Sequence, residues 1–481
     1  MTTTAETLSL LAERLTPLLE RARAASARRA APVLASLSIE LDAAAPPCLA
    51  ARAHFLWEQP SRRFSLAAFG EAARFVAAGP QRFGDLRRRL QRLAEGAVIG
   101  SAPTASGPLP FAHAGFAFDP SHPDNVAWFG FPDAVAVVPR LLFTLSDSRL
   151  FLTANVLVDQ DTNAAQATAD TAGDAGRLLA AAPEAEADET PSRLLDPGSE
   201  SRLYWNDSVR GLTDGILRGD ADKVVLARRV QVESDASFDR GAILRRLRSR
   251  YAECTIFAVR GGEACFLGAT PEMLVHLSGR SVRADCLAGS YPRGATDRED
   301  RRLGEALLAD EKELREHAFV TRSLREALAA LCSDIRQPEQ PVLRKMANVQ
   351  HLSTPVEATT DGPRHVLELV ERLHPTAATA GLPRGRSLQL IREHEPFSRG
   401  WYAGPIGWID AEGGGEFAVA LRSALLRDDV ASLYAGCGIV AGSDPDREYE
   451  ESGLKLQAML WALNATSSEP QSPSPFGRGV G

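Results

Sequence analysis

Two pairs of short apolar segments in the middle of the chain, each pair joined by a tight glycine-containing turn, constrain the fold more than any other feature. The segments are 255–259 with 264–267 around Gly261-Gly262, and 273–277 with 281–287 around Ser278-Gly279-Arg280. Apolar segments joined in this way are typical of β-hairpins, whose strands run antiparallel. Leucines at helical spacing follow over 301–332, which predicts one long helix there. Hairpins mixed with long helices predict an α+β fold with antiparallel sheets, not a regular βαβ repeat.

The length of the chain bounds how its core is organised. A chain of 481 residues is too long for one ordinary hydrophobic core, so two lobes or one large compound domain are expected. An N-terminal lobe over 1–200 carries a helical pattern at 5–24 and strand-like patterns at 134–138 and 150–158. The glycine- and aromatic-rich piece 111–118 is typical of turns between buried strands.

The boundary between the lobes is expected within 160–197, which is rich in Ala, Asp, Glu and Thr and predicts a surface helix with flexible flanks. The second region, 201–465, carries most of the motifs described below and ends in a predicted helix over 446–463. The remaining piece, 466–481, consists largely of Ser, Pro and Gly and is expected to be a disordered tail.

Charge and cysteine usage narrow the function classes. The net charge of −8, from 54 basic and 62 acidic residues, disfavours general binding to nucleic acid. No apolar run approaches the ~18 residues of a membrane span, and the acidic start of the chain lacks the basic region of a secretory signal. The six cysteines are scattered without a CxxC pair, which indicates reduced thiols in a cytoplasmic protein rather than a disulfide framework or a zinc site.

Lysine is rare enough in this chain to make each one informative. Among 54 basic residues, the only lysines are Lys223, Lys312, Lys345 and Lys455. A partly buried lysine can lose its proton and act as a base, whereas arginine stays charged. Lys223 leads into the apolar strand core 224–226, where it is either a base in a desolvated cleft or an ordinary strand end.

Glutamates and glycines near the C-terminus are candidates for metal and anion binding. Glu448, Glu451 and Lys455 are three and four positions apart on one helix face, which can hold a hard divalent cation or form an ordinary surface Glu–Lys pair. The glycine-rich piece 436–443 lets backbone N–H groups approach a carboxylate, or else forms a plain tight turn. No P-loop, GxSxG elbow, HExxH motif or GxGxxG after a strand accompanies them.

Three further residues each have a functional and an ordinary interpretation. Glu316 falls in the long helix and is either a metal ligand or a surface residue. Glu272 follows Thr270-Pro271 and is either a general acid or a residue of a turn or helix N-terminus. Arg422 ends an apolar strand and either forks onto a substrate carboxylate or pairs with a local glutamate.

Together these residues belong to a set of motifs that resembles the chorismate-binding enzymes in content and in order. The resemblance is strongest from residue 203 to residue 463 and looser in the N-terminal half. The motifs are KVVLAR (223–228), FLGATPEML (266–274), LAGSYPRG (287–294), DEKELREHAFV (310–320), VQHLSTPVEA (349–358), HPTAATAGLP (374–383), GWYAGPIGW (400–408), FAVALRSA (417–424) and GCGIVAGSDPDREYEESGLK (436–455).

The resemblance implies a large two-lobed α+β fold, with two antiparallel sheets and helices packed outside, and a magnesium-dependent (Mg²⁺) conversion of chorismate. Lys223 matches the lysine that activates water in isochorismate and salicylate synthases. Anthranilate synthases typically lack that lysine, and aminodeoxychorismate synthases typically have a nucleophilic lysine where this chain has Ala288. The combination implies an isochorismate synthase, which adds water at C2 of chorismate, loses the C4 hydroxyl and feeds menaquinone or siderophore biosynthesis.

The same resemblance implies the residue roles. Lys223 is the expected base and Glu272 the expected acid, while Glu316 and Glu451, with Glu448 nearby, match the magnesium carboxylates. The other matched positions are expected to bind substrate: Tyr402, Arg422, Lys455, Gly436 and Gly438 at the enolpyruvyl carboxylate, Gly289 and Ser290 in the same pocket, and His351 near the ring.

Two other functions stay open. A salicylate synthase would share the first step and then eliminate pyruvate, and Thr379 bears on this choice because it falls at a ring-contacting position where many members have an aliphatic residue. A non-catalytic chorismate-binding protein is the other, and the joint presence of Lys223, Glu272, Glu316 and Glu451 argues against it. We expect a monomer, and no amidotransferase subunit because ammonia is not the expected nucleophile.

Overall fold

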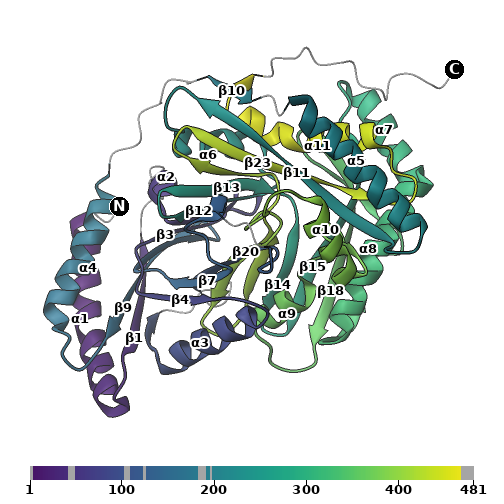
Figure 1. The fold of residues 1–481 in the computed structure, drawn as a ribbon. Helices are drawn as coiled ribbons and strands as arrows, with labels where there is room; N and C mark the ends of the chain where they lie inside the picture. Colours follow the sequence, from purple (N-terminus) through teal and green to yellow (C-terminus); the bar gives the residue numbers. More distant parts are fainter. Residues whose placement is uncertain are drawn as a thin grey trace.

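Two β-sheets lie face to face in the molecule, with helices on their outer sides (Figure 1). The computed structural model describes residues 4–41, 49–101, 109–122, 126–181, 191–195 and 198–466. Among the described strands, only the pairs β1–β5 and β10–β24 are parallel, and every other pair is antiparallel. The α+β architecture with antiparallel sheets is therefore confirmed.

The larger sheet has 14 strands and the smaller has 10. In spatial order the larger contains β24 (Ala465–Thr466), β10 (Ser192–Leu195), β11 (Lys223–Ser234), β23 (Val430–Ile439), β22 (Ser423–Arg427), β13 (Ala264–Thr270), β12 (Thr255–Gly261), β2 (Phe55–Gln59), β3 (Phe64–Phe69), β8 (Leu141–Ser146), β9 (Arg149–Val158), β1 (Val33–Leu41) and β5 (Val98–Ser101), with β19 (Gly381–Leu382) beside β11. The smaller contains β16 (Cys332–Arg336), β18 (Val349–Thr360), β15 (Ser281–Pro292), β14 (Met273–Ser278), β21 (Gly415–Val419), β20 (Pro405–Asp410), β6 (Pro110–Phe116), β7 (Ala134–Val138) and β4 (Ala73–Ala77), with β17 (Val342–Lys345) beside β18.

The helices cover the outer faces of these sheets (Figure 1). They are α1 (Thr4–Arg29), α2 (Leu49–Arg52), α3 (Arg82–Gly96), α4 (Ala164–Leu179), α5 (Gly198–Leu217), α6 (Arg240–Arg250), α7 (Asp297–Ala309), α8 (Glu311–Ala329), α9 (Val366–Leu373), α10 (Arg384–His394) and α11 (Pro445–Ala462). Two of them position the site described below, because α8 packs on β15 and α11 packs on β23.

Alternation along single strands explains how the larger sheet is buried on both faces. In β12, Phe257 and Val259 belong to the core between the two sheets. Ile256 and Ala258 belong to a second core, which they share with residues of α1, α4, α6 and α11. Successive strand side chains point to opposite faces, so a continuous apolar run in one strand supplies both cores.

The N-terminal part of the chain contributes strands to both sheets. In the larger sheet β2 pairs with β12, and in the smaller sheet β6 pairs with β20. Strands from before and after residue 200 are therefore hydrogen-bonded neighbours in each sheet. The segment 1–200 completes the two sheets that carry the region 201–465.

Most of the predicted elements lie at or near their expected positions. Both hairpins are confirmed, as β12–β13 around Gly261-Gly262 and as β14–β15 around 278–280. The predicted helices at the two ends of the chain are α1 and α11, and the predicted strands at 134–138 and 150–158 are β7 and β9. The surface helix expected within 160–197 is α4.

Two element predictions are wrong. The single helix over 301–332 is instead two helices, because Asp310 ends α7 and its carboxylate accepts hydrogen bonds from the backbone N–H groups of Lys312 and Glu313 at the start of α8. The segment 111–118 is not a turn, since most of it forms the fully buried strand β6. Its Gly115 marks close packing, because a Cβ there would lie 2.0 Å from the Trp401 ring.

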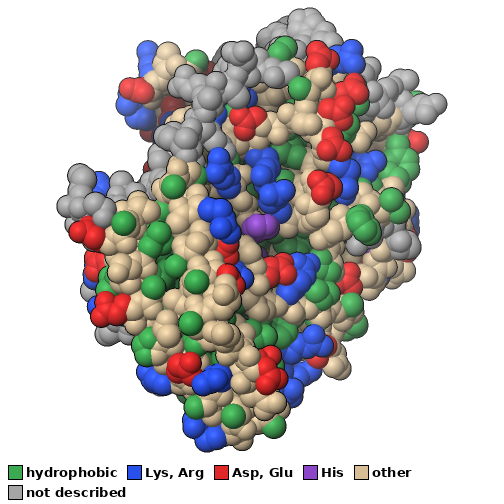
Figure 2. All heavy atoms as spheres, turned by 90° about the vertical axis from the view of Figure 1, so that its left-hand side faces the viewer, with side chains coloured by type: hydrophobic (Ala, Val, Ile, Leu, Met, Phe, Trp, Pro, Cys, Tyr) green, Lys and Arg blue, Asp and Glu red, His purple; other side chains and the backbone are tan. Residues whose placement is uncertain are grey.

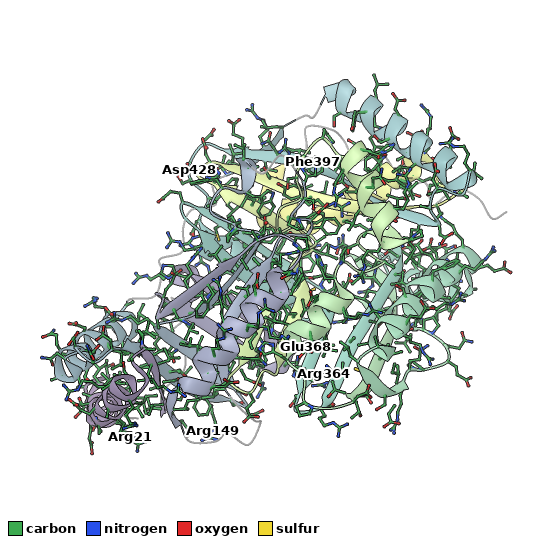
Figure 3. All side chains as sticks on the ribbon, turned by 60° about the horizontal axis from the view of Figure 1, so that its bottom comes forward. Arg21, Arg149, Arg364, Glu368, Phe397 and Asp428 are labelled. Atoms are coloured by element: carbon green, nitrogen blue, oxygen red, sulfur yellow. The ribbon has the colours of Figure 1, made fainter. Side chains whose placement is uncertain are left out.

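The surface carries scattered charge. In the face shown in Figure 2, Lys and Arg side chains gather near the middle and acidic ones are spread around them. Surface ion pairs fix some helix ends, as between Arg364 and Glu368 at the start of α9, 3.3 Å apart (Figure 3). Over the described ranges, no helix is long and apolar enough to cross a membrane. Five cysteines are buried free thiols, whereas Cys48 and the predicted tail beyond Thr466 lie outside the described residues.

Candidate active site

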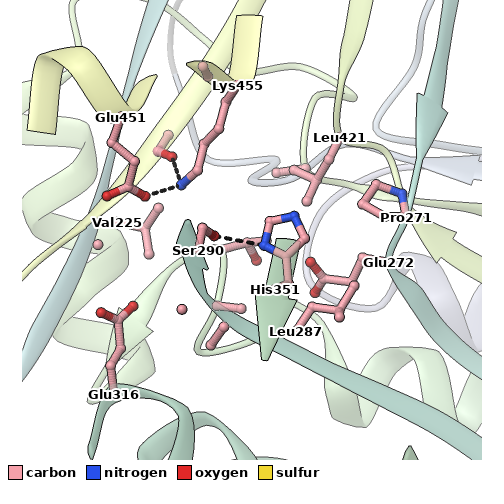
Figure 4. A pocket seen from close by; sticks show the side chains of 18 of the residues that line it. Val225, Pro271, Glu272, Leu287, Ser290, Glu316, His351, Leu421, Glu451 and Lys455 are labelled. Atoms are coloured by element: carbon pink, nitrogen blue, oxygen red, sulfur yellow. Dashed lines mark hydrogen bonds and ion pairs between the residues drawn. The ribbon is translucent and has the colours of Figure 1, made fainter. Parts of the chain in front are cut away.

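One pocket gathers all of the site residues that the sequence predicted. It lies where strands β11, β15, β18 and β23 meet helices α8 and α11, and its volume is ≈ 110 Å³ (Figure 4). The predicted residues in its lining are Lys223, Glu272, Gly289, Ser290, Glu316, His351, Tyr402, Arg422, Gly436, Gly438, Glu448, Glu451 and Lys455.

Glycines on β23 leave room for the lysine side chains. Gly436 and Gly438 lie inside the strand, paired with β11, whereas the later part of the glycine-rich piece turns at 441–442 before α11. A Cβ on Gly438 would lie 2.6 Å from Lys223 Cε and 3.1 Å from Glu316 Oε1, so the lysine side chain would have to move from its place. The carbonyl oxygen of Gly436 accepts a hydrogen bond from Lys455 Nζ at 2.9 Å. The glycines thus let two functional side chains approach this strand.

Lys223, the first residue of β11, forms a buried ion pair with Glu316. Its Nζ lies 2.6 Å from Glu316 Oε1, and the two side chains are 7% and 19% exposed. Burial alone would raise the pKa of Glu316, but the charge of Lys223 and its hydrogen bond lower that pKa below its usual range. The predicted desolvated position of Lys223 is confirmed.

Four glutamates from two helices line the pocket: Glu313 and Glu316 of α8, and Glu448 and Glu451 of α11. Burial and the charges of Glu316 and Glu451 raise the pKa of Glu313 to about 7. Burial and the charge of Glu451 raise the pKa of Glu448 to about 7, although Ser443 Oγ donates a hydrogen bond to it at 2.8 Å. Carboxylates that repel one another in this way, and that offer only oxygen donors, fit a hard divalent cation.

The sequence analysis missed two residues of this cluster. Glu313 lies three positions before Glu316, and helical spacing could have placed both on one face. Cys437 has its Sγ grouped with carboxylate oxygens of Glu448 and Glu451, all within 4.8 Å of one another, and donates to the backbone carbonyl of Glu448 at 3.1 Å. Hard cations prefer oxygen, so the glutamates rather than this thiol are the expected ligands.

Two cationic groups, Lys455 and Arg422, are suited to a substrate carboxylate. Lys455 Nζ lies 2.6 Å from Glu451 Oε1; burial would lower the pKa of Lys455, but the charge of Glu451 raises it above its usual range. Arg422 has a left-handed backbone (φ 49°) just before β22, and burial lowers the pKa of its guanidinium. Within the described part of the chain, no hydrogen bond or ion pair holds this guanidinium. An unpaired guanidinium beside the Tyr402 hydroxyl favours an anionic ligand.

Glu272 lies on the opposite side of the pocket from Glu316 and Glu451, beyond Ser290 and His351 (Figure 4). It is 6% exposed. Burial first, and then the charge of Asp285, raise its pKa to about 7, against the lowering effect of nearby cations. A carboxyl group with this pKa is a proton donor near neutral pH.

Ser290 and His351 form a hydrogen-bonded pair between these two sides. Ser290 Oγ lies 2.7 Å from His351 Nδ1, and burial lowers the pKa of the imidazole to about 3, so the ring is neutral. His351 Nε2 is buried without a hydrogen-bond partner, which leaves it for a ligand. Gly289 takes φ +79° at the β-bulge between Ala288 and Ser290, a conformation that favours glycine.

A buried ion pair that the sequence did not reveal holds one wall of the pocket. Arg399 and Glu395 are each 3% exposed and bind one another. The Arg399 guanidinium donates to the carbonyls of Thr379 at 2.9 Å and Val225 at 2.7 Å, and Glu395 accepts from the Ala227 N–H at 2.7 Å. The pair therefore ties β11 to the loop that carries Thr379, the residue expected near the substrate ring.

Comparisons with known proteins agree with this arrangement. Residues 19–464 match the model of the chorismate binding enzyme family. The salicylate biosynthesis isochorismate synthase of Pseudomonas aeruginosa is 36% identical over 455 residues, which cover 92% of each chain. Isochorismate synthase MenF of Bacillus subtilis is 35% identical over 416 residues, which cover 85% of this chain and 87% of that one.

A solved structure supports the same relationship. The menaquinone-specific isochorismate synthase MenF from Escherichia coli superposes with a TM-score of 0.74 at 26% identity, over 93% of this chain and 99% of that one. The family match spans nearly all of the described residues, both sheets and every pocket residue. On this evidence the chain belongs to the family of chorismate-binding enzymes.

Proposed function

We propose that this protein is an isochorismate synthase, which converts chorismate reversibly to isochorismate. The observation that carries the proposal is the presence in one pocket of a buried lysine, Lys223, and a carboxyl group, Glu272, whose pKa burial raises to about 7. Ala288 also lines the pocket, where a nucleophilic lysine would be needed for aminodeoxychorismate synthesis. Relatives named as isochorismate synthases match this chain over most of their length, which supports the proposal.

Chorismate carries two carboxylates, and the pocket offers groups for both. The unpaired Arg422 guanidinium, the Lys455 ammonium and the Tyr402 hydroxyl would hold the enolpyruvyl carboxylate. The neutral His351 and its partner Ser290 would lie beside the ring, and Thr379 would contact it. Charged partners at one end and neutral groups beside the ring would fix the orientation of the substrate.

The glutamates on α8 and α11 would hold Mg²⁺. Glu316 and Glu451 are the expected ligands, with Glu448 and Glu313 beside them. Bound there, Mg²⁺ would anchor the ring carboxylate of the substrate and offset its negative charge. The raised pKa values of Glu313 and Glu448 are the observation that supports a cation in this place.

The reaction moves one proton at each end of the reacting system. Lys223 Nζ takes a proton from the water whose oxygen bonds to C2. Glu272 gives its proton to the C4 hydroxyl as the C4–O bond breaks, the ring double bonds shift and water leaves. One water is consumed and one is released, so the isomerisation balances, and in the reverse direction each residue takes the role of the other. Lys223 Nζ, which lies 2.6 Å from Glu316 Oε1, would leave that carboxylate to reach the water.

Product analysis tests this function. Purified protein is incubated with chorismate and Mg²⁺ near neutral pH, and the products are separated by chromatography. The expected result is an equilibrium mixture of chorismate and isochorismate, with little salicylate and no anthranilate even when ammonium is added. A chelator should stop the reaction, and added Mg²⁺ should restore it.

Two other results would each overturn the proposal. Salicylate and pyruvate formed in equal amounts, at the rate at which chorismate disappears, would identify a salicylate synthase. Chorismate binding without any turnover would identify a non-catalytic binding protein. If the proposal holds, the protein would act as a cytoplasmic monomer without an amidotransferase subunit, and its product would feed menaquinone or siderophore biosynthesis.

A further inference from the structure

A second cavity, of ≈ 30 Å³, lies directly behind Glu272. Glu272 and Leu287 line both this cavity and the active-site pocket, so their side chains form the partition between the two. Since one buried water needs roughly 10–15 Å³ of such volume, the second cavity has room for about two waters. Among the residues described, Glu272 is therefore the one titratable residue that lines both the active-site pocket and the second cavity.

The polar groups of the second cavity suit bound water. Besides Glu272, its lining includes the Asp285 carboxylate, the Ser323 and Thr376 hydroxyls and the Arg384 guanidinium. Asp285 accepts hydrogen bonds from Ser353 at 3.0 Å and from Arg344, and a carboxylate has further lone pairs to offer a water. A buried water typically makes two to four hydrogen bonds, and these groups supply them.

The second cavity also leads toward solvent. Glu272 at its inner end is buried, Ser323 is half-buried and Arg384 is exposed. The apolar part of the lining comes from α8, α9, β14, β15 and the segment before β19. Water entering near Arg384 would reach Glu272 without crossing the active-site pocket.

The proposed reaction creates a need for such a passage. Each forward turnover leaves Glu272 as a carboxylate and Lys223 as an ammonium group, and the site is ready again only when Lys223 has given up its proton and a proton has returned to Glu272. The pocket in front of Glu272 is then filled by the ring, because substrate and product occupy the same space. A route behind the acid avoids this obstruction.

We propose that the cavity behind Glu272 holds a short file of waters that carries protons between Glu272 and solvent, with Asp285 as the residue that positions these waters. The inference rests on the proposed function, because it assigns a task only to an acid that changes protonation state in each turnover. Asp285 does not touch the substrate in this scheme and acts through water on Glu272.

The test is to fill the second cavity from helix α8. Ala327 lines it, and Ala327→Leu would occupy the volume of the waters. Ala318 lies on the same helix, is exposed and lines neither cavity, so Ala318→Leu is the matched control. Ser323→Leu fills the cavity from a second position.

The expected result is a split between kcat and KM. Both filling variants should lower kcat about tenfold, as slowed proton return limits turnover, with KM for chorismate within about twofold. Their solvent deuterium isotope effect on kcat should rise, and a small diffusible acid such as imidazolium should restore part of the rate. Ala318→Leu should match the unmodified enzyme in all of these measurements.

Normal kcat in a filled variant that has the melting temperature of the parent would overturn the water route. A parallel change of kcat and KM without a larger isotope effect would do the same, since it indicates a distorted pocket. If both filled variants fail to fold, a crystal structure of the unmodified protein decides: ordered waters between Glu272 and Asp285 support the route, and an empty cavity overturns it. Absence of isochorismate from the unmodified enzyme would count against the function itself, which separates the two failures.

Discussion

Lys223 and Lys455 occupy the same pocket, yet their surroundings fit them to different tasks. Lys455 binds Glu451 and the carbonyl of Gly436, and its pKa is held high, which suits a permanent cation. Among the described residues, the Lys223 Nζ group has Glu316 as its one hydrogen-bond partner. Its partner is 93 positions away along the chain, so no local spacing in the sequence could predict the contact. The motifs identified Lys223 and Glu316 as candidate site residues, whereas their ion pair could be found only from the folded structure.

The role of Lys223 is tested by two substitutions. Lys223→Ala and Lys223→Arg should each lower isochorismate formation at least about 100-fold, because a base must give up its own proton first and arginine does not. Chorismate binding, measured by calorimetry, should persist in both variants. Turnover by Lys223→Arg at the parent rate would mean that the residue contributes positive charge only.

The raised pKa of Glu272 predicts the pH dependence of the forward reaction. Glu272 acts in its protonated form, and burial with the charge of Asp285 places its pKa at about 7, against the opposing charges of Arg422, Lys223 and Lys455. The rate of isochorismate formation at saturating chorismate should therefore fall as the pH rises through about 7. Rate measurements between pH 5.5 and pH 9, on the order of half a unit apart, would check this. A rate that stays flat up to pH 9 would remove Glu272 from the role of acid.

At the scale of elements, the break between α7 and α8 determines where two of the pocket glutamates lie. The leucine pattern continues through 301–332 and therefore predicts one helix. The spacing of apolar residues shows which face of a helix is buried, but it does not show where the chain changes direction. Helix α7 instead ends at Asp310. The Asp310 carboxylate caps α8 and also accepts a hydrogen bond from the Tyr291 hydroxyl at 2.8 Å. The new helix then carries Glu313 and Glu316 into the pocket. A polar residue that ends one helix and caps the next is easily missed inside a strong apolar repeat.

The cap of α8 can be tested against the cap of α7. Asp310→Ala should cost about 1 kcal/mol of stability in chemical denaturation and should also raise the Mg²⁺ concentration needed for half-maximal activity, because α8 carries Glu313 and Glu316. Thr296 caps α7 through the N–H of Glu299, so Thr296→Ala should cost a similar free energy. Its Mg²⁺ requirement should stay that of the parent. Equal Mg²⁺ requirements in the two variants would contradict the positioning role of Asp310.

At the scale of the whole molecule, the two sheets join regions of the chain that the sequence separates. Hairpins and strand alternation predicted the α+β class, because those signals are local. The pairing of β2 with β12 and of β6 with β20 joins residues roughly 200 and 300 positions apart and leaves no local signal, so the composition change near residue 200 reads as a domain boundary. The residues that line the pocket were predicted better than the residues that hold its walls in place. The motifs include Lys223 and Glu316, but they do not reveal the Arg399–Glu395 ion pair.

This sharing of sheets predicts that the motif-rich region does not fold alone. A fragment of residues 198–466 loses β2 beside β12 and β6 beside β20, which exposes strand edges and apolar faces in both sheets. Such a fragment should be insoluble or should lack a cooperative thermal transition followed by circular dichroism. A soluble fragment with a sharp transition would show that the catalytic region is an independent domain.

The two lysine–glutamate pairs tie cation binding to substrate binding. Glu316 and Glu451, the expected ligands of Mg²⁺, are each engaged by a lysine, so a cation that takes the carboxylates releases ammonium groups for the anionic substrate. Thermodynamic linkage then requires reciprocity: the factor by which Mg²⁺ raises chorismate affinity equals the factor by which chorismate raises Mg²⁺ affinity, about tenfold for a coupling of typical size. Calorimetric titrations in both orders, on the Lys223→Ala variant so that no turnover intervenes, would measure it through the remaining Lys455–Glu451 pair. Equal chorismate affinity with and without Mg²⁺ would mean that the two ligands bind independently.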